Sequence, residues 1–430
     1  MKRKRYSGFL FEQGVRLTPV LVWTCGMLLT MVSMSKAQSL DSYLTTAAEN
    51  NPDLEAIHQQ YLAALERIPQ VGALPDPMLS LGFFVIPVET RVGPQQAKLS
   101  LTQQFPWFGS LAARKDAAAQ MAIAQLVRLE GSKQFLFFRV KKQWYSLYEN
   151  EKIVAITQEN IEILHSLESL ALTRYEAGVA GLVDVIRVQL LISEMENEQK
   201  LLEGNIKPLT AAFNQLLNRD LQIAVELPDS LEDTGWYPVD FNQLVQNHPQ
   251  VQYFHALKEE LDLQDKIAVL KSKPNFGVGL DYGFIGKRNI SDLPDNGKNV
   301  LMPMVSLSLP LSQKKYRADR QEVKYKSSSV EQQTQSVMNQ LQTDYEFAFR
   351  NYQDAARKME LYADQITWSN QALNILISSF SAAGKDFEEV LRMQQLILKY
   401  QTLMVKAQAA KHSAIAELEY LSSQYNLKQE

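Results

Sequence analysis

Two segments of this chain are too long for the helices of an ordinary globular domain. Residues 110–175 contain no proline and one glycine, Gly131, and residues 311–380 contain neither residue type. A continuous helix over either segment would be about 100 Å long, at a rise of about 1.5 Å per residue. Because packing supplies most of the stability of helices, we expect these to lie along others in a coiled-coil-like array.

Apolar residues recur every seven positions on two different faces of the first long segment. One seam is formed by Val140, Leu147, Val154 and Ile161, and the other by Ile156, Ile163 and Leu170. Two seams predict a neighbouring helix on each side, as in a ring of helices. Gly131 costs a helix about 1 kcal/mol against alanine, and this cost predicts close packing where it lies.

Four short segments alternate between apolar residues and small or polar ones, the pattern of strands with one apolar face. They cover residues 79–85, 99–105, 276–284 and 305–311. Two interpretations remain open: a half-buried sheet packed on helices, or a lipid-facing band of a barrel whose other face meets water. Four strands cannot close a barrel alone, so the second interpretation requires several chains. The predicted fold class is mainly α with a small β part.

An internal repeat organises the chain. Pro52 is echoed by Pro249 and Pro77 by Pro274, each 197 residues later. The tripeptide Arg187-Val188-Gln189 resembles Arg392-Met393-Gln394, which follows 205 residues later. Each copy shows the same order: helix, two strands, very long helix, tight turn, helix. Two copies of one unit with small insertions explain this pattern.

The repeat defines the predicted domain boundaries. The first structural repeat covers residues 38–218, and the second covers residues 239–430. Between them, residues 219–238 form a polar linker in which the helical pattern breaks.

The first 37 residues have the pattern of an export signal. A basic stretch is followed by a largely apolar one and by Ser35-Lys36-Ala37, which places small residues at a cleavage site before Gln38. The alternative is a retained membrane anchor. The single cysteine, Cys25, lies inside this segment, so the mature chain should hold no disulfide.

Charge and motifs exclude several classes of function. Removing the first 37 residues, which hold six Lys or Arg and one acidic residue, changes the net charge from −4 to −9. Such a charge argues against nucleic acid as a partner. The five histidines lack metal-ligand spacing, and Gly277-x-Gly279 lies within a strand pattern, so we predict no enzyme activity, cofactor or metal site. Met302 and Met304 belong to a strand pattern as packing residues.

Two glycine turns follow the long segments. The first reads Tyr175-Glu176-Ala177-Gly178-Val179-Ala180-Gly181-Leu182-Val183-Asp184-Val185, and the second reads Phe380-Ser381-Ala382-Ala383-Gly384-Lys385-Asp386-Phe387-Glu388-Glu389-Val390. Glycine allows tight reversal between antiparallel helices. Both turns resemble the helix-tip turns of the TolC family of outer-membrane efflux proteins. The shared order is an aromatic residue, a glycine, an apolar residue and an acidic-Val pair.

This resemblance covers essentially the whole mature chain and implies an architecture. Three chains would each give four strands to a twelve-stranded barrel in the outer membrane, continued by a long α-helical barrel through the periplasm. The implied function is a passive exit duct of a tripartite efflux system. Its partners would be outer-membrane lipid, a periplasmic adaptor and an inner-membrane pump of the resistance-nodulation-division type.

The resemblance also assigns roles at the turns. Asp184 and Glu389 would lie at the periplasmic gate, where a ring of three carboxylates attracts cations and repels itself. Arg392 stands where the family usually has a further acidic residue, and we hypothesise that it pairs with Asp184 or Glu389 across helices as a latch. The alternative is solvated charges on helix ends. The docking ridge for the adaptor would consist of Gly178, Val179, Leu182, Gly384 and Phe387.

The segment Phe105-Pro106-Trp107-Phe108-Gly109 resembles the junction from barrel strand to helix, and Pro310 marks its second copy. Its aromatic residues suit an interfacial girdle or a core. Loops 87–95 and 286–299 would face outside the cell. The junction and Pro75-Asp76-Pro77 are most similar to the heavy-metal branch (CusC- or CzcC-like), while drug efflux and type I protein secretion stay open. The alternative of a different class is a periplasmic coiled-coil scaffold without a pore.

Overall fold

The structure is a computed structural model that describes residues 40–290, 292–383 and 387–423. The predicted export signal, residues 1–37, lies outside the described residues. Everything described belongs to one unit, residues 37–430. None of its helices within the described ranges is both long enough and apolar enough to cross a bilayer.

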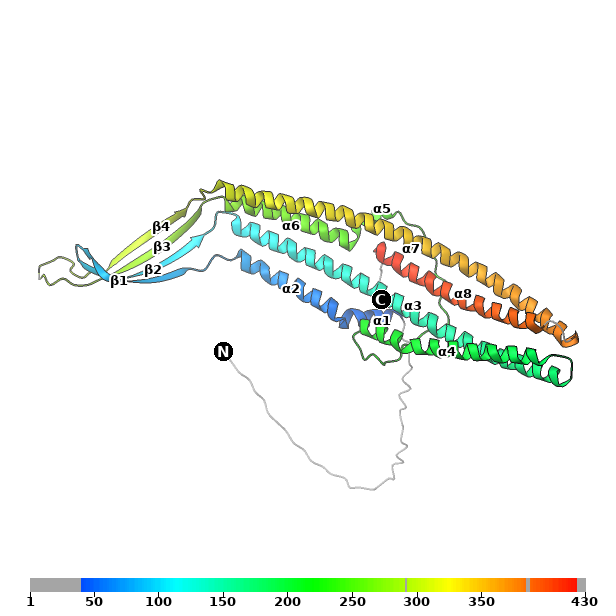
Figure 1. Ribbon diagram of the computed structural model, residues 1–430. Coiled ribbons are helices and arrows are strands. Elements are labelled where there is room, and N and C mark those ends of the chain that lie inside the picture. Colours follow the sequence, from blue (N-terminus) through cyan, green and yellow to red (C-terminus); the bar gives the residue numbers. More distant parts are fainter. Residues whose placement is uncertain (1–39, 291, 384–386, 424–430) are drawn as a thin grey trace, which may run out of the picture. The chain divides into compact units, whose positions relative to one another are not determined.

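Each half of the chain holds the elements in the predicted order (Figure 1). The first half comprises α1 (Leu40–Asn50), α2 (Pro52–Gly72), β1 (Met78–Thr90), β2 (Gly93–Phe105), α3 (Ser110–Glu176) and α4 (Leu182–Leu216). The second comprises α5 (Phe241–Leu244), a short 3₁₀ helix (Val245–Asn247), α6 (Pro249–Lys271), β3 (Asn275–Ile285), β4 (Val300–Ser308), α7 (Gln313–Ala383) and α8 (Phe387–Leu421). The two long segments are therefore continuous helices, as their composition predicts.

The first helix of each half is broken at the echoed prolines. Asn51 caps α2, since its Oδ1 accepts from the backbone N–H groups of Asp53 and Leu54, both at 3.1 Å. Its amide also donates to the carbonyl of Leu216 at 2.9 Å, which ties α2 to the end of α4. At the start of α6, His248 Nδ1 accepts from the backbone N–H of Gln250 at 3.2 Å. Proline suits the first position of a helix because no hydrogen bond from that N–H is lost.

The four strands form one antiparallel sheet in the order β1-β2-β3-β4. Its register aligns Leu79 with Leu101, Leu101 with Leu280 and Leu280 with Pro303, so one face is apolar across all four strands. Most of these apolar side chains are exposed in the single chain. Within the described residues, β1 and β4 each pair on one side only. The sheet thus offers two open edges and an apolar face that none of the described helices covers.

The opposite face of β3 is covered by its neighbouring strands. A Cβ on Gly277 would collide with the Ser306 hydroxyl, and one on Gly279 would lie 3.2 Å from the hydroxyl of Thr102. Side chains of β2 and β4 therefore fold over the small residues of β3. The same face carries the ion pair of Lys98 and Asp281, whose Nζ and Oδ2 lie 2.5 Å apart.

The first hairpin is tighter than the sequence predicts. Residues 87–95 are expected as a loop, but Val88 pairs with Gln95 and Thr90 with Gly93. The Thr90 hydroxyl donates to the Gly93 carbonyl at 2.6 Å, and Gly93 adopts φ 136°. Glycine enters this region without steric cost, which permits the two-residue turn. The second expected loop, 286–299, is found between β3 and β4.

Helix α3 lies in the middle of the helical part. It contacts α2 and α4, and it also contacts α6 and α8 (Figure 1). Helix α7 contacts α6 and α8 in turn. Gly131 of α3 lies against the start of α6, where an added Cβ would be 3.0 Å from Pro249 Cβ. Close packing therefore accounts for a glycine inside this long helix, as predicted.

Residues 219–240, between α4 and α5, contain no helix or strand and are held by side chains of the helices. The hydroxyl of Tyr43 accepts from the backbone N–H of Glu226 at 3.0 Å, and that of Tyr352 accepts from Trp236 N–H at 3.0 Å. Lys411, almost fully buried on α8, pairs with Asp233. The connection between the halves is thus fastened to helices of both.

Candidate functional site

The turn between α3 and α4 forms the first hairpin tip. Gly178 has φ 71°, and the N–H of Val179 donates to the Arg174 carbonyl at 3.0 Å, which closes the end of α3. Helix α4 begins at Leu182, after Gly181. Val179 and Leu182, two residues of the predicted docking ridge, are both about half exposed.

The second tip joins α7 to α8. Gly384 lies outside the described residues, which resume at Phe387. Phe387 is only 3% exposed and packs on Phe380, with ring centroids 4.7 Å apart. Its ring therefore belongs to the tip core and does not lie on the surface, where the predicted docking ridge would place it.

An apolar core joins the two tips. It contains Leu167, Val185, Val188, Phe380 and Val390, which come from α3, α4, α7 and α8. Because the cluster contains residues of both hairpins, separating the hairpins would expose apolar surface at about 25 cal/mol per Å². The contact between the tips is thus mainly hydrophobic.

Charged groups link the hairpins at the rim of this core. Arg187 on α4 lies 2.9 Å from Glu388 on α8, measured from Nη1 to Oε2. The same guanidinium lies 3.8 Å from Asp184 Oδ1, one turn earlier. Arg174, near the end of α3, donates to the carbonyl of Ser381 and lies 5.5 Å from the centroid of the Phe380 ring.

Arg392 does not make the hypothesised pair across helices. Its Nε lies 3.0 Å from Glu389 Oε2, and both residues belong to α8, one turn apart. The geometric reason is the helical period: residues three apart share a face, so the nearest carboxylate lies on its own helix. At the tips, Arg187 pairs with a carboxylate of the other hairpin.

Sequence reasoning did not identify Arg174, Arg187 or Glu388 as site residues. A signal for Arg187 was present, because it occupies the position in the first repeat that Arg392 occupies in the second. No comparable signal indicated Arg174, since its partner is a backbone carbonyl of another helix.

A buried polar network lies between α3 and α8, farther from the tips. Gln394 Nε2 donates to Asn160 Oδ1 at 2.8 Å, and Asn160 Nδ2 donates to Gln401 Oε1 at 3.3 Å. Asn160 and Gln394 are almost fully buried. Polar side chains at such positions fix the register of packed helices at some cost in stability.

The predicted junction lies where β2 meets α3. Pro106 and Trp107 follow the last residue of β2, and Gly109 precedes α3 with φ 80°. The Trp107 ring stacks on Phe276 of β3 at 5.6 Å, whereas Phe108 is 79% exposed. Pro310 lies at the corresponding place between β4 and α7.

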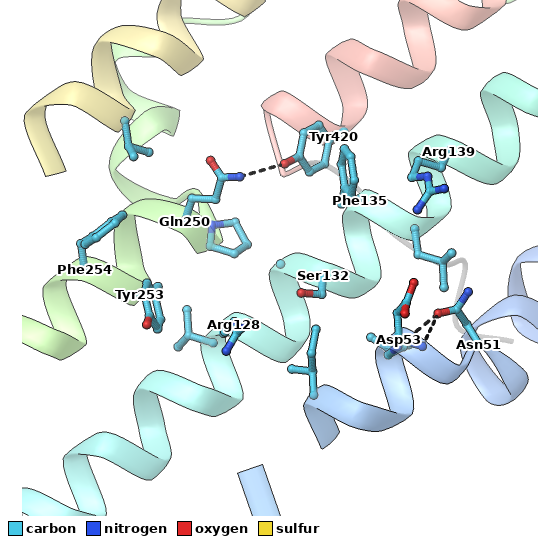
Figure 2. A pocket seen from close by; sticks show the side chains of 17 residues that line it. Asn51, Asp53, Arg128, Ser132, Phe135, Arg139, Gln250, Tyr253, Phe254 and Tyr420 are labelled. Carbon is cyan, nitrogen blue, oxygen red and sulfur yellow. Dashed lines mark hydrogen bonds between the residues drawn. The ribbon is translucent and has the colours of Figure 1, made fainter. Parts of the chain in front are cut away.

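A groove of about 820 Å³ lies on α3 between the beginnings of α2 and α6 (Figure 2). Its wall includes Phe135, Tyr253 and Tyr420, and Gln250 donates to the Tyr420 hydroxyl at 3.3 Å. Arg128 and Arg139 line it as well, but Arg128 already donates to Gln60 at 3.1 Å. The groove holds no assembly of polar groups that converges on one point.

Among the described residues, the titratable side chains form no metal-binding cluster, and two histidines are buried. In the part of the chain that the structure describes, no three His, Cys, Asp or Glu side chains could share a metal ion. His248 is buried beside the Tyr420 ring, and burial lowers its pKa to about 4. Burial likewise lowers the pKa of His412, which lies next to Tyr145.

The fold is similar to that of several solved outer-membrane proteins and channels. VceC, an outer membrane protein of Vibrio cholerae, superposes with a TM-score of 0.73 at 15% identity, covering 89% of this chain and 95% of its own. CusC gives a TM-score of 0.76 at 11% identity, covering 90% and 92%. The open state of the MtrE channel of Neisseria gonorrhoeae gives 0.72 at 15%, covering 89% and 88%.

At the level of sequence, residues 43–219 match the family model described as outer membrane efflux protein. The matched segment runs from α1 to just beyond α4 and so includes the first hairpin tip. None of the curated proteins gives a significant match to the chain.

Proposed function

We propose that this chain is one of three protomers of an outer-membrane channel, the passive exit duct of a tripartite efflux system. The observation that carries the proposal is the four-stranded sheet with two open edges and an exposed apolar face. Open edges and apolar faces require partners, since water does not favour either. Three copies would join edges into a closed wall of twelve strands whose apolar face meets lipid.

The helices support the same assembly. Leu361, Trp368 and Ile375 follow one another at intervals of seven along α7, and each is more than half exposed. On α4, at the other side of α3, Leu190 and Leu201 are also exposed. In a trimer, α7 of one protomer would pack on α2 and α4 of the next, which extends the ring that the heptads predict.

In this duct the hairpin tips form the periplasmic gate. Asp184 and Glu389 would contribute carboxylates to the constriction, and each has an arginine of its own chain nearby. We assign the link between hairpins to Arg187 and Glu388 in place of Arg392. The exposed Val179 and Leu182, together with Gly178, would contact the helical hairpin of a periplasmic adaptor, and the inner-membrane pump would supply the energy.

The proposed function defines the exported cargo by its chemical class. Small molecules or metal cations driven by a resistance-nodulation-division pump are the leading cargo, with the heavy-metal branch suggested by the junction sequence. Export of protein by a type I system is the alternative within the fold. Sensitivity of a deletion strain to copper or zinc salts, to drugs, or to neither would separate these cargoes.

The deciding experiment separates a duct from a coiled-coil scaffold. Outer-membrane fractions should contain a trimer that dissociates on heating in detergent, and the purified trimer should conduct ions in planar bilayers. A soluble monomer without conductance would favour the scaffold and overturn the proposal.

A further inference from the structure

The junctions between strands and helices carry exposed cations. On the sheet side lie exposed apolar residues: Phe108 before α3, and Leu309 and Leu311 before α7, the last 85% exposed. Within a few residues the helices change to basic side chains. We define the basic collar as Arg114 and Lys115 of α3, Lys273 before β3, and Lys314, Lys315 and Arg317 of α7.

The collar is free of carboxylate partners. Among the described residues, none of its six cations forms an ion pair. Two nearby acidic residues, Asp265 and Asp319, pair with Arg320 and Lys271, while the exposed Asp116, next to Lys115, also forms no ion pair with a described residue. All collar residues are exposed except Arg114, which is half-buried. The junction before β1 differs, since it holds Asp76 and no cation after Arg67.

The helix dipole makes this arrangement unfavourable for the chain alone. The beginning of a helix carries partial positive charge and favours acidic residues. Neither α3 nor α7 has an acidic residue in its first turn, and Gly109 gives α3 no side-chain cap. Cations therefore surround two helix ends that themselves attract anions, which points to an anion supplied from outside the chain.

The other end of the sheet has a different character. There Arg288 pairs with Glu89 at 2.6 Å, and Lys298 pairs with Asp295 at 3.3 Å. Two of the four cations at this end, Arg288 and Lys298, are thus neutralised by the chain itself, while Arg91 and Lys287 form no ion pair among the described residues. The helix-side end combines exposed apolar residues, six unpaired cations and two helix beginnings without an acidic residue in the first turn.

We propose that the basic collar binds the phosphate groups of anionic phospholipids in the membrane leaflet that faces the helices. This inference rests on the proposed function, because it requires the sheet to lie in a bilayer. Long Lys and Arg side chains reach from an apolar boundary to the head groups, and aromatic residues such as Phe108 lie at the same depth. A cation near an anionic surface contributes about 1 kcal/mol, or about fivefold in binding.

The test compares the variant Lys314→Gln/Lys315→Gln/Arg317→Gln with wild type. Its matched control is Lys200→Gln/Lys207→Gln/Lys399→Gln, which removes the same charge from exposed, unpaired positions on α4 and α8. Native mass spectrometry of the purified oligomer would count retained phosphatidylglycerol and phosphatidylcholine of equal chain length. We expect wild type and control to prefer phosphatidylglycerol, and the collar variant to lose about a hundredfold of that preference, because it lacks three cations that contribute about fivefold each. High salt should weaken the preference of wild type.

Three outcomes would overturn the collar. One is a variant that retains as much phosphatidylglycerol as wild type. Another is a variant that falls apart into single chains with unchanged lipid per chain, because the cations would then contact a neighbouring copy. The third is a wild-type channel that conducts but shows no lipid preference. If wild-type protein neither forms an oligomer nor conducts, the proposed function itself fails, and the two failures are thereby distinguished.

Discussion

Three arginines lie at the hairpin tips, and their partners distinguish them. Arg392 contacts a carboxylate of its own helix, Arg187 contacts one on the other hairpin, and Arg174 contacts a carbonyl and an aromatic ring. Only contacts between hairpins change when the tips separate. In the proposed duct, Arg187 and Arg174 can therefore influence the opening of the tips, whereas the Arg392 pair would survive opening unchanged.

Replacing Arg187 by alanine should favour the open channel. The side chain of Arg187 is 43% exposed and that of Glu388 69%, so solvent screening limits the pair to about 0.5 kcal/mol. We expect the open fraction to rise about twofold in single-channel recordings at low salt, and the difference to vanish at about 1 M salt. Arg392→Ala is the control. An equal response from both variants would contradict the assignment to Arg187.

His248 should make stability depend on pH. Its pKa is lowered to about 4 by burial, from the ordinary value of about 6.5. Because the folded pKa is depressed, protonation favours unfolding. Above about pH 6.5 the His248 ring is neutral in both the folded and the unfolded state, and its full contribution to the free energy of unfolding is present. This free energy decreases by about 3 kcal/mol as the pH falls to 4. Thermal melts followed by circular dichroism from pH 7 to 4 would record this decrease.

The control for His248 is asparagine, which retains a side-chain oxygen for the helix cap but does not titrate. His248→Asn should flatten the pH dependence in this range. A wild-type slope that persists in His248→Asn would assign the titration to other groups.

At the scale of elements, the sequence predicted the kind of each helix or strand better than the residues at which it ends. Residue patterns identified the four strands and the long helices, because period and composition are local properties. They missed the extension of β1 and β2 to a two-residue turn, which depends on pairing between Val88 and Gln95. The seam of Ile156, Ile163 and Leu170 was expected to be covered, yet Ile163 is exposed in the single chain. Coverage there would have to come from another chain.

Dependence on distant segments also limited what the sequence could predict at the hairpin tips. The sequence placed Asp184 and Glu389 near the turns, since turns follow from glycine and from the end of an apolar pattern. It could not give the buried position of Phe387 or the partner of Arg187. The partner of Arg187 depends on how α8 is rotated against α4, which is a property of two hairpins separated by about 200 residues. The burial of Phe387 depends on how α8 packs on Phe380 of α7.

The first tip requires a glycine at position 178. Its φ of 71° costs an alanine about 1–2 kcal/mol, so Gly178→Ala should lower the thermal midpoint. Gly204 inside α4 is the matched control, because an added Cβ there meets open space and alanine stabilises a helix interior by up to about 1 kcal/mol. Circular dichroism melts should shift in opposite directions. A shared direction would argue against the strained turn.

The two faces of β1 should respond differently to charge. Leu81 belongs to the apolar face and Ser80 to the opposite one. Leu81→Glu should reduce the heat-modifiable oligomer in membranes, because a charge facing lipid costs about 2 kcal/mol per chain. Ser80→Glu should leave the yield nearly unchanged. Equal losses in the two variants would indicate that the apolar face is not the one in contact with lipid.

At the scale of the whole molecule, a single chain exposes apolar surface on both its sheet and its helices. Within the part of the chain that the structure describes, the sheet has no partner at either edge, α7 exposes a heptad seam, and α4 exposes leucines. Further copies of the chain, placed side by side, would cover both the sheet edges and the exposed seam of α7. A scaffold would need the exposed seam but not the open sheet, so the coincidence of the two favours a closed wall of chains.

The contact between protomers can be tested by substitutions on α7 alone. Leu361→Glu/Trp368→Glu would place six buried carboxylates in a trimer, and burying an unpaired charge costs several kcal/mol. We expect sedimentation of the purified variant to show single chains. The control Ala363→Glu/Asn370→Glu adds the same charge at exposed positions, also seven residues apart, on another part of α7. It should retain the oligomer, because no apolar seam crosses those positions. If both variants stay trimeric, then α7 does not form the contact between copies, and the exposed residues Leu361, Trp368 and Ile375 must meet something other than a second protomer.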